Sequence, residues 1–320
     1  MRIDLEKLQE FENTIDTIQP ERGKVPIKIL GYGEISLVFE LANDDQPIAY
    51  KRLPIFDSET QVNRHILAYD IYHQILQRLH LIVPAHDAIW VQSQKGNIVL
   101  YCAQEKIPVE TVGHKILHHS ISKKEIHTLI LLIMREMHKI WAFSHRSKTL
   151  KVGLDGQISN WAVIGYNPQN PHISEDDQLI YLDTSTPMFR KQGIEAMEPI
   201  LFLKSAPFFL RWLLKALFLK EVVDRYYDWR LVTIDLVANF FKEQRPELIP
   251  GVLKVINDFF SEEAVEFDII PLTYEEVKKY YDEDKQIWVI FQNTRHLDRY
   301  IQTKLLRKQY DFYLPGMIQR

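Results

Sequence analysis

The stretch VGLDGQISNWAV, residues 152–163, decides how the rest of the chain is interpreted. It places two glycines around Asp155, in a chain that has only 11 glycines among 320 residues. This is about half of the usual ~7%, so each glycine is expected where the backbone needs it. Asp155 and Asn160 have the spacing D-x-x-x-x-N, which arises often by chance. Its meaning therefore depends on what accompanies it.

The composition is that of an ordinary globular protein, with 46% hydrophobic and 26% charged residues. The length of 320 residues is enough for one large core or two moderate ones. A formal net charge of −4 gives no reason to expect nucleic acid or an anionic membrane as a partner.

The single cysteine, Cys102, cannot form an internal disulfide, and its setting IVLYCAQ indicates a buried strand. We therefore expect a reducing, cytoplasmic location. The apolar run at 206–223 contains Arg211, Lys215 and Lys220. It is too short and too charged to cross a bilayer, so we expect a buried helix and no transmembrane segment.

Residues 1–106 are predicted to form a sheet-rich lobe. A charged amphipathic helix is expected over about residues 3–19, followed by three antiparallel strands at KVPIKIL, SLVFELA and QPIAYKRL. A capped helix over 57–79 and a hairpin of AIWVQSQ with NIVLYCAQEKI complete the lobe. The result is a five-stranded antiparallel sheet with one helix inserted between its strands.

Residues 107–320 are predicted to form a larger, mostly helical lobe. Two short apolar runs, ISNWAVIGY and QLIYLD, interrupt the helical patterns. We expect helices at 122–145, 206–223, 226–243, 249–261, 274–282 and 291–308. The fold class is therefore α+β with two lobes that meet near residue 106.

Seven residues suited to phosphoryl transfer occur in order on these elements: Gly31, Gly33, Ser36, Lys51, Asp155, Asn160 and Asp183. Glycines let a loop lie close over phosphates, and a strand lysine binds phosphate oxygens. An aspartate in a loop orients a hydroxyl and accepts its proton. An asparagine and a second aspartate supply the hard oxygen ligands that Mg²⁺ prefers.

The motifs GYGEIS at 31–36, AYK at 49–51, DGQISN at 155–160 and LD at 182–183 resemble the protein-kinase-like superfamily. The resemblance is closer to its small-molecule branch, the aminoglycoside phosphotransferase and choline kinase group, and covers about residues 25–190. It implies a bilobal kinase-like fold that binds ATP and Mg²⁺ and phosphorylates a hydroxyl of a small molecule. The implied roles are catalytic for Asp155, nucleotide-binding for Gly31, Gly33, Ser36 and Lys51, and metal-binding for Asn160 and Asp183. The backbone of residues 104–106 is implied to contact adenine.

An acid on the helix at 57–79 would hold Lys51 in place. Glu59 and Asp70 are 11 residues apart, about three helical turns, so they share one side of the helix. The gap from Lys51 to Asp70 is nearer the usual kinase spacing, whereas Glu59 has the longer side chain. We prefer Glu59, and Asp70 is the alternative.

Three departures from the superfamily pattern leave a second function open. Ser36 replaces the third glycine of the loop, Leu154 stands where protein kinases have arginine, and TSTP follows Asp183 instead of FG. They favour a kinase-like scaffold that binds nucleotide or protein without catalysis. Transfer of a nucleotidyl group from the same site is a third reading. The sequence determines neither the acceptor nor the oligomeric state.

Overall fold

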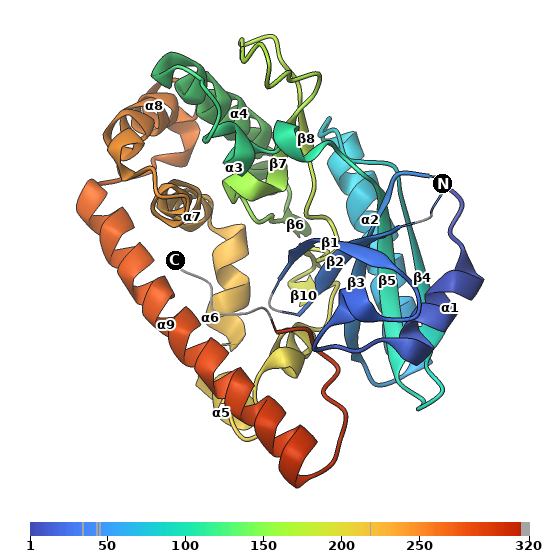
Figure 1. Ribbon diagram of the computed structural model, residues 1–320. Helices are drawn as coiled ribbons and strands as arrows, with labels where there is room; N and C mark the ends of the chain where they lie inside the picture. Colours follow the sequence, from blue (N-terminus) through green and yellow to red (C-terminus); the bar gives the residue numbers. More distant parts are fainter. Residues whose placement is uncertain (34, 43, 45, 218, 315–320) are drawn as a thin grey trace.

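The computed structural model describes residues 1–33, 35–42, 44, 46–217 and 219–314; Glu34, inside the GYGEIS motif, lies outside them. Figure 1 shows a sheet-rich lobe beside a larger helical lobe. The α-helices are α1 (Leu5–Thr14), α2 (Glu59–Arg78), α3 (Gly113–Ile116), α4 (Lys123–Arg146), α5 (Arg211–Leu217), α6 (Leu219–Asp224), α7 (Trp229–Lys242), α8 (Ile249–Glu262) and α9 (Tyr274–Tyr300). The predicted α+β fold class is confirmed.

The amino-terminal sheet is antiparallel throughout, with the strand order β1-β2-β3-β5-β4. Its strands are β1 (Ile27–Tyr32), β2 (Leu37–Leu41), β3 (Ile48–Phe56), β4 (His86–Gln92) and β5 (Ile98–Glu105). Successive side chains of a strand point to opposite faces. On β3, Tyr50 packs with α1 residues such as Phe11, whereas Leu53 packs with Val62 and Tyr69 of α2. Lys51 therefore shares the α2 face of the sheet, and Arg52 shares the α1 face.

The helical lobe is built around α4, α7 and α8, whose apolar faces share one core with residues of α2. Two small antiparallel sheets contribute buried residues to this core. One joins β6 (Leu150–Val152), β9 (Phe189–Lys191) and β10 (Ile194–Glu195), and the other joins β7 (Trp161–Val163) and β8 (Leu179–Tyr181). These short strands carry the loops that hold the candidate site.

Three sequence-based boundaries are corrected. The first helix ends at Thr14, because Ile15 leaves the helical conformation and Pro20 starts a separate 3₁₀ turn. The helix expected at 206–223 begins only at Arg211, and its described residues on the two sides of position 218 are the helices α5 and α6. The two helices expected at 274–282 and 291–308 form one continuous helix, α9, which a short π-helical turn (Ile301–Leu305) follows.

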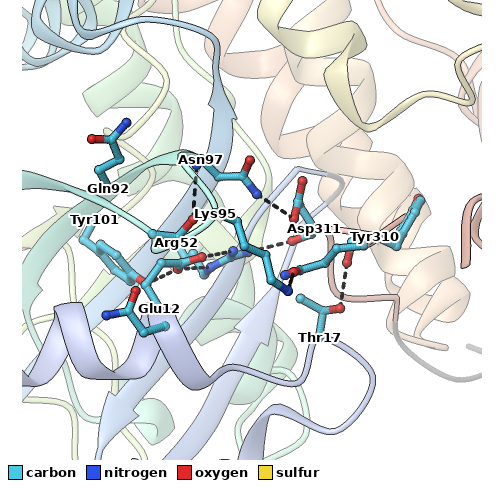
Figure 2. Close-up of polar contacts among 12 residues, drawn as sticks. Glu12, Thr17, Arg52, Gln92, Lys95, Asn97, Tyr101, Tyr310 and Asp311 are labelled. Atoms are coloured by element: carbon cyan, nitrogen blue, oxygen red, sulfur yellow. Dashed lines mark hydrogen bonds and ion pairs between the residues drawn. The ribbon is translucent and has the colours of Figure 1, made fainter. Parts of the chain in front are cut away.

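The last described residues return to the amino-terminal lobe (Figure 2). The carbonyl oxygen of Tyr310 accepts a 2.7 Å hydrogen bond from the Thr17 hydroxyl, and that of Asp311 accepts one of 2.7 Å from Arg52. Asn97 donates to the Asp311 carboxylate over 3.1 Å. We therefore propose the division of the chain near residue 106 with residues 309–314 assigned to the first lobe.

Candidate active site

The β7–β8 pair brings two distant polar residues together. Trp161 and Tyr181 are directly opposed in this pair, Asn160 immediately precedes β7, and Asp183 follows β8 by two residues. The backbone N–H of Leu182 donates to the carbonyl of Asn160 over 2.8 Å. The predicted metal-binding positions, 160 and 183, therefore lie at one end of the same two-stranded sheet.

Asp155 lies in a loop that hydrogen bonds hold on three sides. The backbone N–H of Gln157 donates to its carboxylate over 3.1 Å, and the Asn160 amide donates to its carbonyl over 3.1 Å. The hydroxyl of Tyr181 is 3.2 Å from its backbone nitrogen. The loop is also packed tightly, because a Cβ on Gly153 would lie 2.3 Å from the carbonyl oxygen of Tyr226. This close approach explains one of the two glycines that flank Asp155.

Lys51 of the first lobe and Asp183 of the second form an ion pair, with Nζ and Oδ1 separated by 2.8 Å. Both side chains are about a quarter exposed, at 24% and 23%. Ser185 donates its hydroxyl to the same Asp183 oxygen over 3.2 Å. Two residues that are 132 positions apart in sequence are thus joined at a point that is partly exposed to solvent.

The expected contact between α2 and Lys51 is corrected. Glu59 is exposed at the first turn of α2, Asp70 is exposed further along, and neither forms an ion pair with Lys51 among the described residues. The buried face of α2 presents His65 instead, whose Nε2 is 3.0 Å from the Ser185 carbonyl. Burial lowers the pKa of His65 to about 4. Since a carbonyl only accepts, neutral His65 donates from Nε2 and holds the segment that follows Asp183.

The predicted phosphate-binding loop is a tight connection between β1 and β2. The backbone N–H of Gly33 donates to the Ser36 carbonyl over 3.0 Å. A Cβ on Gly33 would lie only 2.9 Å from the Ser36 hydroxyl oxygen, so the close turn requires glycine or a rotated serine. A Cβ on Gly31 would meet nothing within 4 Å, which leaves space on that side of β1. Lys51 is directly opposed to Val38 of β2, next to this loop.

The backbone at the end of β5 is already engaged. The N–H of Glu105 donates to the Ala85 carbonyl over 2.8 Å, and that of Lys106 donates to the Pro47 carbonyl over 2.7 Å. These two groups are therefore not free to donate to adenine, contrary to the expectation for residues 104–106. The Gln104 side chain donates to the Thr184 hydroxyl over 2.6 Å and connects this segment to Asp183.

Burial raises the pKa of Asp155 to about 7, and the nearby carboxylates of Asp235 and Asp183 raise it in the same direction. The Gln157 hydrogen bond and Lys242 oppose the shift. Asp235 lies on α7 and accepts a 2.9 Å hydrogen bond from the Gln157 side chain. Asp155 is therefore a carboxylate that takes up a proton near neutral pH, as a general base needs to do.

We expect the stability of the metal-free protein to depend on pH through Asp155. Its folded-state pKa lies above the ordinary value of 3.8, so the unfolded chain releases this proton first and stability falls as the pH rises from about 4 to 7. Asp155→Asn should remove this loss and stabilise the protein at pH 8 by up to about 4 kcal/mol. Urea unfolding in EDTA at several pH values measures the difference, which should grow up to pH 7 and then stay constant. Equal stabilities of the two proteins at pH 8 would contradict the shift.

The family of the chain follows from a sequence comparison. A family described as "Family of unknown function (DUF6206)" matches residues 10–299. The chain belongs to this family. A comparison of the sequence with curated proteins found no significant match.

Two solved structures are similar to this DUF6206 chain. The GDP complex of wild-type aminoglycoside 2'-phosphotransferase-IIIa has 10% identity and a TM-score of 0.32, covering 74% of this chain and 93% of that chain. The GDP complex of a point mutant of that enzyme has 12% identity and a TM-score of 0.33, covering 81% and 91%. Likenesses this weak carry no argument about function. None of the helices in the described ranges is long and apolar enough to span a bilayer.

The donor set of this DUF6206 site fits a magnesium ion that is shared with phosphates. No group of three or more His, Cys, Asp or Glu residues in the described part of the chain is placed to hold a metal. Mg²⁺ is commonly held by only one or two protein side chains together with water and substrate phosphates. Asp183 supplies a carboxylate. The Asn160 amide donates through Nδ2 to Asp155, which directs its Oδ1 away from that bond.

Sequence reasoning missed His65, Gln157 and Asp235. Asp235 had a recognisable signal, since it is the one acid in the apolar run LVTIDLVANFF at 231–241, and such acids are rarely buried without partners. Gln157 lay inside the quoted motif with nothing to distinguish it. The face of α2 that carries His65 becomes evident only from the packing of that helix.

Proposed function

We propose that the protein is an ATP- and Mg²⁺-dependent phosphotransferase that acts on a hydroxyl group of a small molecule. The observation that carries the proposal is that Lys51, Asp155, Asn160 and Asp183, from three separate parts of the chain, lie close together. A lysine beside a glycine loop, a base near neutral pKa and two oxygen ligands are the parts that phosphoryl transfer uses.

The nucleotide would be held by the first lobe. The backbone of the Gly31–Ser36 loop would lie along the phosphates, and Lys51 would contact phosphate oxygens in place of its present partner, Asp183. Asn160 and Asp183 would hold Mg²⁺, which when bound neutralises phosphate charge. Glu59 has no part in this account, because its side chain is exposed and makes no ion pair with Lys51 among the described residues.

Asp155 would orient the acceptor hydroxyl and accept its proton late in the transfer. Its loop is fixed through Gln157 and Asn160, so the carboxylate is positioned before the substrate arrives. Because the transition state of phosphoryl transfer is loose, positioning and charge neutralisation supply most of the rate.

One observation favours the alternative of a kinase-like scaffold. The N–H groups of residues 105 and 106 are both engaged within the protein, so adenine would lack those donors. A scaffold of this kind would bind nucleotide weakly or not at all. Nucleotidyl transfer would need the same lysine and metal ligands, and is distinguished by its product.

We expect Mg²⁺ and ATP together to raise the melting temperature of the protein. Ligand at a hundred times its dissociation constant stabilises the folded state by about 2.7 kcal/mol, a shift that is readily measured. Lys51→Ala and Asp183→Ala should each abolish the Mg²⁺-dependent part of the shift, because they remove the phosphate contact and the metal ligand.

Glu59→Ala is the matched control and should respond to ATP and Mg²⁺ like the unmodified protein. No shift at millimolar ATP would reject the phosphotransferase in favour of the scaffold. Where binding is seen, acceptors are sought among small hydroxyl compounds, and release of ADP or of pyrophosphate separates phosphoryl from nucleotidyl transfer.

A further inference from the structure

The second half of helix α9 presents large apolar side chains to solvent. Figure 1 shows α9 as a long helix along the outer edge of the helical lobe. The exposed fractions are 67% for Ile287, 63% for Ile290, 51% for Leu297 and 58% for Tyr300. Val289 is 49% exposed on the same half of the helix. Apolar side chains normally face the core, so this arrangement needs an explanation.

These residues share one face, opposite to the buried one. At 100° per residue, Ile290 and Leu297 differ in direction by only about 20°, and Tyr300 and Ile287 lie within about 80° of them. Of the buried residues of the helix, Val277, Tyr281 and Arg295 point to the other side, and Asp298 lies at the edge of the apolar face, beside Ile287. The apolar residues therefore form a continuous stripe over 287–300, which we call the α9 stripe.

The first half of the same helix provides the comparison. There the solvent face carries charged residues such as Glu275, Lys279 and Glu283, all of them exposed. The change from charged to apolar occurs near Gln286. An exposed helix face does not by itself account for the apolar residues of the α9 stripe, because the solvent face of the same helix is charged before residue 287. Contiguous exposed apolar surface of this kind marks an interaction site.

The charges along the helix indicate which partner fits. Residues 274–286 contain five acids and three lysines, whereas residues 287–308 contain five arginines or lysines and one acid. A second copy of the helix in antiparallel orientation would bring the acidic half of each against the basic half of the other. Such a pairing is two-fold symmetric, the commonest arrangement of protein dimers.

We propose that the α9 stripe is the interface of a symmetric homodimer, with its two-fold axis near Asn293 and Thr294. In this register Ile290 of each copy lies opposite Leu297 of the other, and Ile287 lies opposite Tyr300. Glu283 lies opposite Lys304, both of which are exposed in the single chain. The apolar residues then fill the centre of the interface and the charges its rim.

A lipid surface fits these residues less well. The centre of the stripe contains Asn293 and follows Gln286, and amides at the centre of a face are costly in the acyl region of a bilayer. Between two helices, by contrast, the Asn293 amides of both copies lie near the axis, where they can hydrogen-bond to each other.

The mass of the full chain is measured by light scattering and analytical ultracentrifugation between 1 and 100 μM. We expect a dimer, and Ile290→Glu should raise its dissociation constant at least about 100-fold, since each dimer buries the substitution twice. Ile194→Glu is the matched control: Ile194 is 69% exposed on β10 and should tolerate glutamate without any change in mass. A monomer at 100 μM overturns the proposal, as does a dimer that Ile290→Glu leaves intact.

A cysteine pair tests the register. The one native cysteine, Cys102, is buried, so it does not compete for an oxidant. Position 293 lies next to the proposed axis, so Asn293→Cys should form a disulfide with the same cysteine of the second subunit. Glu275→Cys, exposed on the same helix but far from the axis, should not. Equal cross-linking of both variants, or binding of the purified chain to vesicles that Ile290→Glu abolishes while the mass stays monomeric, would overturn the proposal.

Discussion

Asp155→Asn is expected to lower turnover by about 10³-fold while leaving nucleotide affinity nearly unchanged. The substitution keeps the size of the side chain and removes its ability to take up a proton. The bond from the Gln157 N–H can still form, because the amide oxygen also accepts. Lys51 and Asp183 do not contact the altered group by any hydrogen bond among the described residues, so the nucleotide contacts should persist.

The measurement is a comparison of turnover under saturating ATP with the dissociation constant of ATP in the presence of Mg²⁺. Asp183→Asn is the matched control with the opposite pattern, because it weakens a metal ligand and should therefore reduce Mg²⁺-dependent binding first. If Asp155→Asn retains full turnover, Asp155 is not the base. If it loses ATP binding as strongly as Asp183→Asn, its role is structural.

The proximity of some candidate site residues follows from their short separation in the sequence. Asn160 lies five residues after Asp155, and one turn of chain is enough to bring its amide to the Asp155 carbonyl. Asp183 ends an apolar run that pairs with the run after Asn160, so two antiparallel strands suffice to join them. The predictions for these three positions came from their order along the chain and from the resemblance to the kinase-like superfamily, and the pairing of β7 with β8 was not among them.

The partner of Lys51 was not predictable in this way. Choosing Glu59 required knowledge of which side of α2 faces the sheet, and both acids considered lie on its exposed side. The helix buries Val62, His65, Tyr69 and Tyr72 instead, whereas the choice between the two acids was made on sequence spacing and side-chain length. A similar difficulty arose in α9, where the apolar residues of 287–290 face solvent and concealed the continuity of the helix.

The largest effect on stability is expected from Arg52, the residue after Lys51. Its side chain and that of Glu12 are each 2% exposed, and they form two hydrogen bonds of 2.7 Å (Figure 2). Tyr101 donates to the same Glu12 carboxylate over 2.6 Å, and Arg52 donates its third bond to the Asp311 carbonyl. This network joins α1, β3, β5 and the last described segment of the chain.

Arg52→Met should lower the free energy of unfolding by about 3–5 kcal/mol, because Glu12 then remains as a buried charge without its cation. The double substitution of Arg52→Met with Glu12→Leu should recover most of that loss, since removing both charges also removes the cost of burying them. Urea unfolding at pH 7 of the unmodified protein, the two single variants and the double variant gives the coupling free energy. A loss below about 1 kcal/mol in Arg52→Met would mean that water reaches Glu12.

The same variants separate two roles of the network. Arg52 also holds residues 309–314 against the sheet, so both Arg52→Met and the double variant lose the bond to the Asp311 carbonyl. Hydrogen exchange in residues 309–314 should therefore be faster in both, although only the single variant is strongly destabilised. Arg52 and Lys51 are adjacent on β3 and point to opposite faces, so this anchoring lies directly behind the proposed nucleotide site. Weaker ATP binding in the double variant, at nearly normal stability, would show that the carboxyl-terminal segment supports the strand that carries Lys51.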